Sequence, residues 1–184
     1  MHAKQALIIL ATYGLVTSGL LAGCASGTSG SSAPQVLNNS QLPAVATTQT
    51  ASLSPLGQTL LGVINEYRKG PPLGVEVRLQ RIASVHAADM AARNFRGHHN
   101  PEGQGPLDRM LAVNPDFKGT VGENIWVGTR SSGQSDADFA QHVLQGWLNS
   151  PSHRTLLESD KYSQTGVGIA TQGNVFYAVQ TFSR

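Results

Sequence analysis

Residues 121–127 read VGENIWV, a short run of strand-forming residues that contains a single ionisable side chain, Glu123. Valine, isoleucine and tryptophan favour extended structure, so the run predicts a β-strand. A carboxylate in such a strand is costly to bury unless it is paired or faces a polar cleft. Glu123 is therefore either part of a functional site or the partner in a structural ion pair.

The segments on either side of this strand predict an α+β domain, with helices packed on an antiparallel sheet. Ser-Pro pairs at positions 54 and 150 and a serine at position 135 are typical helix starts. A Gln172-Gly173 turn between two apolar runs predicts a β-hairpin. The expected helices begin near residues 54, 76, 106, 135 and 150, and the expected strands span residues 121–127, 166–171 and 174–182.

The N-terminal segment predicts export and lipid anchoring. Residues 1–23 have a positive start followed by an interrupted apolar core, which is typical of a signal peptide. The segment ends in LAGC, which resembles the bacterial lipobox, so Cys24 is expected to carry palmitate and other acyl chains that anchor the chain stably. The alternative is that Cys24 is a buried free thiol. Ala25 in place of an aspartate favours the outer membrane if the organism is Gram-negative.

The remaining chain divides into a linker and one domain. Residues 24–53 are uncharged and rich in small polar residues, which predicts a flexible tether, and the folded domain is expected at residues 54–184. Cys24 is the only cysteine, so that domain contains no disulfide. A net charge of +2 without a basic cluster gives no reason to expect a nucleic-acid partner.

Two further segments carry candidate site residues. Residues 97–103 read GHHNPEG and residues 147–153 read WLNSPSH. If His98 and His153 converge on Glu123, the cleft could hold a metal ion or move a proton. His99 is expected to diverge from His98, and Ser150 is either a helix cap or a nucleophile assisted by His153.

Six motifs in order resemble bacterial members of the CAP superfamily, which includes cysteine-rich secretory proteins, insect venom antigens and plant pathogenesis-related proteins. The resemblance covers about residues 54–184. The motifs are HAADMA at 86–91, HHNPEG at 98–103, PLDRM at 106–110, GENI at 122–125, WLNSPSHR at 147–154 and TGVGIA at 165–170.

This resemblance implies a three-layer α-β-α sandwich with a central antiparallel sheet and a cleft. In the family, a His/Glu/Glu/His set lines the cleft and binds zinc in some members. Matched by motif, that set corresponds to His98, Glu123 and His153. The second glutamate position falls on Ser150, so one carboxylate is missing. The remaining three residues still form an ordinary zinc ligand set with an open position.

Three functions follow as hypotheses. The first is a binding module whose cleft holds zinc or another divalent metal, or a lipid, sterol or cell-envelope ligand. The second is a zinc-dependent hydrolase of peptide, ester or cell-wall substrates, with His98, His153 and Glu123 as its catalytic residues. The third is a structural or interaction domain with an inert cleft. The sequence leaves open whether the protein is an enzyme, and gives no oligomeric state.

Overall fold

The computed structural model describes residues 52–184. The expected signal peptide, Cys24 and nearly all of the expected linker lie outside these residues. The described residues form one sheet with the strand order β1-β3-β4-β2. Strand β4 pairs antiparallel with both β2 and β3, whereas β1 runs parallel to β3. The strands are β1 (Gly74–Val75), β2 (Val121–Thr129), β3 (Gln164–Gln172) and β4 (Val175–Ser183).

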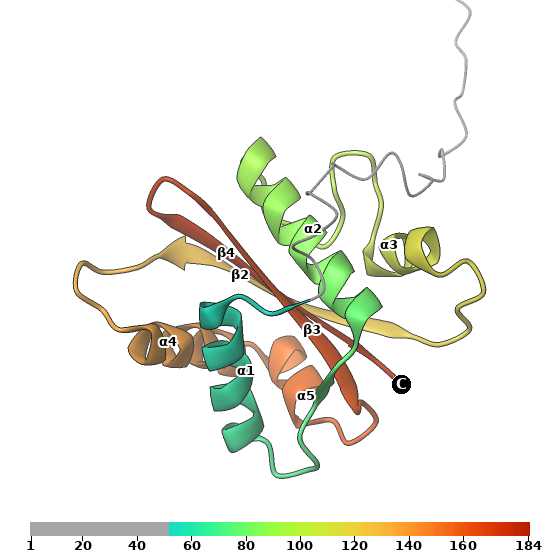
Figure 1. The fold of residues 1–184 in the computed structure, drawn as a ribbon, viewed down its shortest axis with the longest axis horizontal. Coiled ribbons are helices and arrows are strands. Elements are labelled where there is room, and N and C mark those ends of the chain that lie inside the picture. Colours follow the sequence, from blue (N-terminus) through green and yellow to red (C-terminus); the bar gives the residue numbers. More distant parts are fainter. Residues whose placement is uncertain (1–51) are drawn as a thin grey trace, which may run out of the picture. The chain divides into compact units, whose positions relative to one another are not determined.

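Helices cover both faces of this sheet, as Figure 1 shows. On one face, Ile125 and Val179 pack against Ala83, Ala87 and Met90 of α2, and α3 lies beside α2. On the other face, side chains of β3 and β4 pack against α1 and α4 around the buried Trp147. The predicted three-layer sandwich is confirmed. The helices are α1 (Pro55–Tyr67), α2 (Val77–Arg93), α3 (Pro106–Val113), α4 (Asp136–Leu148) and α5 (Pro151–Glu158).

Two glycines of β3 let α2 approach the sheet at backbone distance. A Cβ atom added at Gly166 would lie 2.2 Å from the backbone nitrogen of Gln80, and one at Gly168 would lie 2.2 Å from the carbonyl oxygen of Ala83. The Gln80 amide then bonds to both backbone groups of Val167, at 2.8 and 2.9 Å. This close contact fixes α2 on the sheet, and with it the loop that follows α2.

Most of the expected boundaries are correct, and the differences are local. Ser54 and Ser135 cap α1 and α4 with their side chains, as predicted. Ser150 occupies the N-cap position of α5, but its side chain makes no capping hydrogen bond. The hairpin turn lies one residue later than expected, at 173–174, where Gly173 has a φ of +59°. Strand β1 was not predicted, because two residues carry no periodic pattern.

Within residues 52–184, every helix is too short or too polar to cross a bilayer.

Candidate functional site

Three of the predicted site residues meet at the edge strand β2. Glu123 lies on β2, His98 on the loop after α2, and His153 in the first turn of α5. Because no strand of residues 52–184 pairs with the outer side of β2, a loop from one face and a helix from the other can meet beside it. Nδ1 of His98 lies 3.0 Å from Oε1 of Glu123, and the ring centroids of His98 and His153 are 6.2 Å apart.

The Glu123 carboxylate is buried and has a partner at each oxygen. Its side chain is 1% exposed, and Oε2 accepts a hydrogen bond of 2.6 Å from Nη2 of Arg109. Burial alone would raise the pKa of Glu123. The hydrogen bond from His98, the positive charge of Arg109 and the hydrogen bond from Arg109 outweigh this effect, so the pKa of Glu123 is lowered. Glu123 is therefore a carboxylate at neutral pH.

His153 is half-buried beside His98, and its backbone is held by the strand that carries Glu123. Its carbonyl oxygen accepts a hydrogen bond of 3.3 Å from the buried amide of Asn124, the residue after Glu123. Partial burial lowers the pKa of His153, and electrostatic interactions with His98 and Arg96 act in the same direction. The lowered pKa favours the neutral ring, which is the form that can bind a metal ion.

His86 lies close to Glu123 and is buried in the core as predicted, although within residues 52–184 its Nδ1 has no hydrogen-bond partner. It is 1% exposed, its Nε2 lies 2.8 Å from the carbonyl oxygen of Gly97, and the same nitrogen is 4.0 Å from Oε1 of Glu123. Burial and the charge of Arg109 lower the pKa of His86 to about 4, although Glu123, the Gly97 carbonyl and Asp89 act in the opposite direction. His86 is thus neutral at pH 7 and donates its Nε2 proton to the backbone beside His98.

Ion pairs and hydrogen bonds fix the loop that carries His98. Arg93, in the last turn of α2, bonds to Asp89 on the same helix and to Glu102 in the loop, each at 2.5 Å. Inside the loop, the Asn100 side chain bonds to the backbone nitrogen and to the side chain of Gln104. The position of the His98 ring is therefore set by the fold before any ligand binds.

The side chains of His99 and Ser150 contact other residues than His98 and His153. The His99 ring lies against Gly105 at the start of α3, where an added Cβ atom would be 3.0 Å from Nε2 of His99. The hydroxyl of Ser150 lies 3.2 Å from that of Ser152. In the described part of the chain, Ser150 makes no hydrogen bond to the His153 ring, so the nucleophile pair considered for these two residues is not assembled.

The arrangement differs from a preassembled three-ligand metal site. Within residues 52–184, no group of three or more His, Cys, Asp or Glu side chains is positioned to hold a metal ion. The reason is visible at Glu123, since both of its oxygens are engaged by protein donors. The two imidazoles of His98 and His153 are the groups left that could bind a metal ion, and the ionised carboxylate of Glu123 contacts one of them, His98.

Arg109 is the residue of the site that was not predicted as such. It is 3% exposed and sits in the PLDRM segment, which contributes to the family resemblance but carries no obvious chemistry. A clue exists in the sequence: Glu123 in an apolar strand requires a cationic partner if it is buried. Only the packing of α3 beside β2 identifies which arginine this is.

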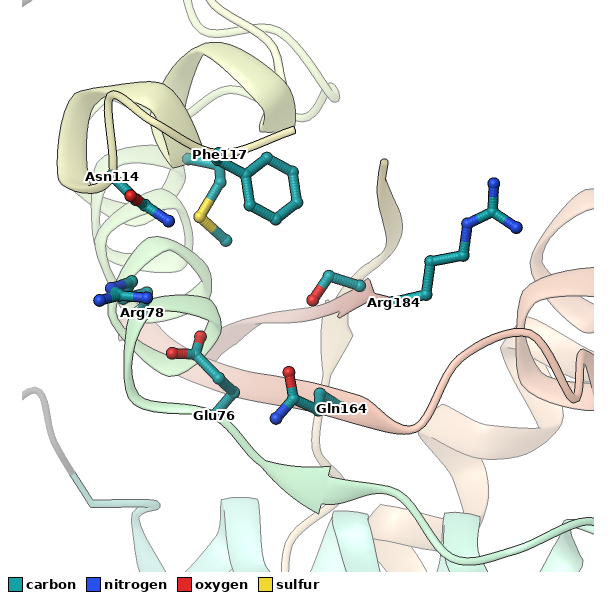
Figure 2. A pocket seen from close by; sticks show the side chains of 8 residues that line it. Glu76, Arg78, Asn114, Phe117, Gln164 and Arg184 are labelled. Atoms are coloured by element: carbon teal, nitrogen blue, oxygen red, sulfur yellow. The ribbon is translucent and has the colours of Figure 1, made fainter. Parts of the chain in front are cut away.

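A cavity of about 230 Å³ lies away from these residues (Figure 2). Glu76, Asn114, Phe117 and Gln164 line it together with the buried Met110. It lies between the start of α2, the end of α3 and the last residues of β4. Among residues 52–184, none of the predicted site residues lines this cavity, so it is separate from the His98–Glu123–His153 group.

Known proteins share this fold and parts of the sequence. The uncharacterized protein YkwD of Bacillus subtilis is 26% identical over 133 residues, which is 71% of this chain and 48% of YkwD. The chain thus matches about half the length of that relative. An extracellular protein of Bacillus anthracis with an SCP domain is 27% identical, with a TM-score of 0.50 over 69% of this chain and 39% of the other.

An outer surface protein of Borrelia burgdorferi aligns with a TM-score of 0.62. It is 22% identical, and the alignment covers 72% of this chain and 95% of the Borrelia protein, so the likeness extends over a whole domain and concerns the fold. The profile of the cysteine-rich secretory protein family, CAP, matches residues 61–182. That match spans α1 to β4 and includes His98, Glu123 and His153. The chain belongs to the CAP family of cysteine-rich secretory proteins.

Proposed function

We propose that this CAP domain is a binding module whose cleft takes a divalent metal ion, zinc first, between His98 and His153. The observation that carries the proposal is the 3.0 Å contact between Nδ1 of His98 and Oε1 of Glu123. An ionised carboxylate only accepts hydrogen bonds, so Nδ1 of a neutral His98 carries the proton. The lone pair then lies on Nε2, the other ring nitrogen.

This contact is the usual way in which proteins orient a metal-binding histidine. Such histidines commonly donate their second ring nitrogen to a carboxylate, which fixes the tautomer and raises the basicity of the ligand. His98 and His153 are within 6.2 Å of each other, centroid to centroid, and the pKa of His153 is lowered toward the neutral form. The two rings would supply two ligands, and water or an envelope ligand would supply the others.

The geometry favours binding over the hydrolase alternative. A general base for hydrolysis needs a pKa near the working pH and access to the attacking water. Glu123 is 1% exposed, its pKa is lowered, and Arg109 holds one of its oxygens. Glu123 therefore orients His98 in this proposal and is neither a metal ligand nor a base.

We further propose that the domain is exported and held at the cell envelope by lipid on Cys24, with residues 24–53 as its tether. The LAGC segment supports the anchor, and relatives described as an outer surface protein and as an extracellular protein support export. A lipid, sterol or other envelope molecule would then meet the cleft at close range.

Zinc titration tests the proposal. The chain is produced with Cys24→Ser and titrated calorimetrically with Zn²⁺, alongside the double variant His98→Ala/His153→Ala and the control His99→Ala. One zinc per chain is expected for the parent and for His99→Ala, and none for the double variant. Equal binding in all three, or none in the parent, would overturn the metal proposal.

A second measurement separates binding from catalysis. The zinc-loaded parent is assayed on peptide, ester and peptidoglycan substrates, and is incubated with envelope lipids followed by extraction. Co-purified lipid without turnover would support the binding module. Turnover that is lost in a Glu123→Gln variant that still holds zinc would instead establish the hydrolase.

A further inference from the structure

Arg109 holds both ends of the His98–Glu123 contact. Its Nη2 donates to Oε2 of Glu123 at 2.6 Å, and Nη1 and Nη2 both lie 3.2 Å from the carbonyl oxygen of His98. Nη1 also donates to the carbonyl oxygen of Gln104 at 2.9 Å. The buried Arg109 guanidinium thus binds the carboxylate of Glu123 and also the backbone of His98, whose ring contacts the same carboxylate.

This arrangement decides which oxygen of Glu123 is left for His98. A guanidinium presents its donors in a fixed plane, so a single arginine can bridge several acceptors at set positions. With Oε2 taken by Arg109, Oε1 faces Nδ1 of His98 at 3.0 Å. The positive charge also favours the ionised form of Glu123, which can accept a hydrogen bond from the protonated Nδ1 but cannot donate one.

We propose that Arg109 is a positioning residue that selects the Nδ1-protonated tautomer of His98 and keeps Glu123 from acting as a metal ligand. The metal part of this inference rests on the proposed function, whereas the tautomer does not. A site with two imidazoles and no free carboxylate suits zinc, copper or nickel, and is a poor site for magnesium or calcium, which prefer oxygen ligands.

The competing explanation is that Arg109 only stabilises the loop. The chain contains a matched control for this explanation, because Arg93 also ties the same loop to a helix. The Arg93 guanidinium donates its hydrogen bonds to Asp89 and Glu102, and none of these bonds involves Glu123. Removing Arg93 should loosen the loop and leave the tautomer of His98 as it was.

The test is ¹⁵N NMR of the imidazole nitrogens in the metal-free full chain, produced with Cys24→Ser, at pH 8.5. In the parent, His98 should carry its proton on Nδ1 and show an unprotonated Nε2. Arg109→Gln should mix the two tautomers and lower zinc affinity about 10–100-fold, the range found when partners of metal ligands are removed. Arg109→Lys, which keeps a charged donor for Glu123, should retain the tautomer, and so should Arg93→Gln.

Two results would overturn the proposal: an Nε2-protonated His98 in the parent, or an unchanged tautomer and zinc affinity in Arg109→Gln. Since Arg109→Gln leaves Glu123 buried without its cation, it can fail to fold. The double variant Arg109→Gln/Glu123→Gln removes both charges and is expected to show mixed tautomers too. A parent with the expected tautomer but no zinc binding would refute the proposed function and leave the positioning of His98 intact.

Discussion

Nδ1 of His98 and Oε1 of Glu123 are 3.0 Å apart, although 25 positions separate the two residues in the chain. One residue is on a loop that follows α2 and the other is inside an edge strand. Their contact links an exposed imidazole to a carboxylate that is 1% exposed. The stability of the fold and the proposed binding therefore depend on the same buried charge.

Glu123→Gln should destabilise the domain strongly, because it leaves the Arg109 guanidinium buried without a counter-charge. Breaking one side of a buried ion pair typically costs about 3–5 kcal/mol. The matched control is Glu102→Gln, which breaks the exposed Arg93 pair at the surface of the same loop and should cost about 1 kcal/mol or less. Urea denaturation of both variants measures the difference. Equal costs would show that the Glu123–Arg109 pair is not desolvated as described.

The domain should lose stability as the pH falls from about 6.5 toward about 4, because of His86. The folded pKa of His86 is lowered to about 4 by burial and by Arg109, against partial opposition from Glu123 and Asp89. The unfolded chain therefore binds a proton first, and acid favours unfolding. A pKa shift of this size contributes about 3 kcal/mol to the free energy of unfolding, and this contribution is fully present above pH 6.5 and lost toward pH 4.

Denaturation curves at pH 7.5 and 4.5 measure this loss. His86→Gln keeps a donor for the Gly97 carbonyl but removes the titration, so its stability should change less between the two pH values. His142→Gln, on the exposed face of α4, is the control and should behave as the parent does. A parent whose stability is flat over this range would contradict the buried, neutral state of His86.

Gly168→Ala should be among the most harmful small substitutions in the domain. The added Cβ atom would lie 2.2 Å from the carbonyl oxygen of Ala83, and backbone at both sides cannot move without separating α2 from β3. Overpacking of this kind costs about 1–3 kcal/mol or more. Gly62→Ala in α1 meets nothing within 4 Å and should stabilise by about 0.5–1 kcal/mol. Thermal unfolding of both variants should therefore shift in opposite directions.

Cys24→Ser should abolish lipid attachment and release the protein from membranes. The expectation rests on the LAGC segment, which lies outside the described residues. Labelled palmitate supplied to cells should appear in the parent and be absent from the variant, and detergent partitioning of the two should differ. Equal incorporation in both would refute the lipobox assignment, and with it the proposed anchor.

The elements that were predicted correctly are those whose signals are local. Ser54 followed by Pro55 starts α1, and Ser135 with Asp138 starts α4, because capping involves donors only two or three residues away. The turn of the β3–β4 hairpin was misplaced by one residue, and β1 was missed, because β1 is defined by pairing with a strand about 90 residues later. Pairing over that distance leaves no periodic trace in a two-residue segment.

The sequence by itself determined the family and the layer order, because six family motifs occur in the expected order along the chain. The same motifs selected two histidines and one glutamate as candidate site residues. Only the tertiary structure shows which groups contact the Glu123 carboxylate. A carboxylate can bind a metal, accept a proton or hold an imidazole, and its role depends on which donors lie within about 3 Å of its oxygens. Those donors, Arg109 and His98, reach Glu123 only because α3 and the loop after α2 pack beside the open edge of β2.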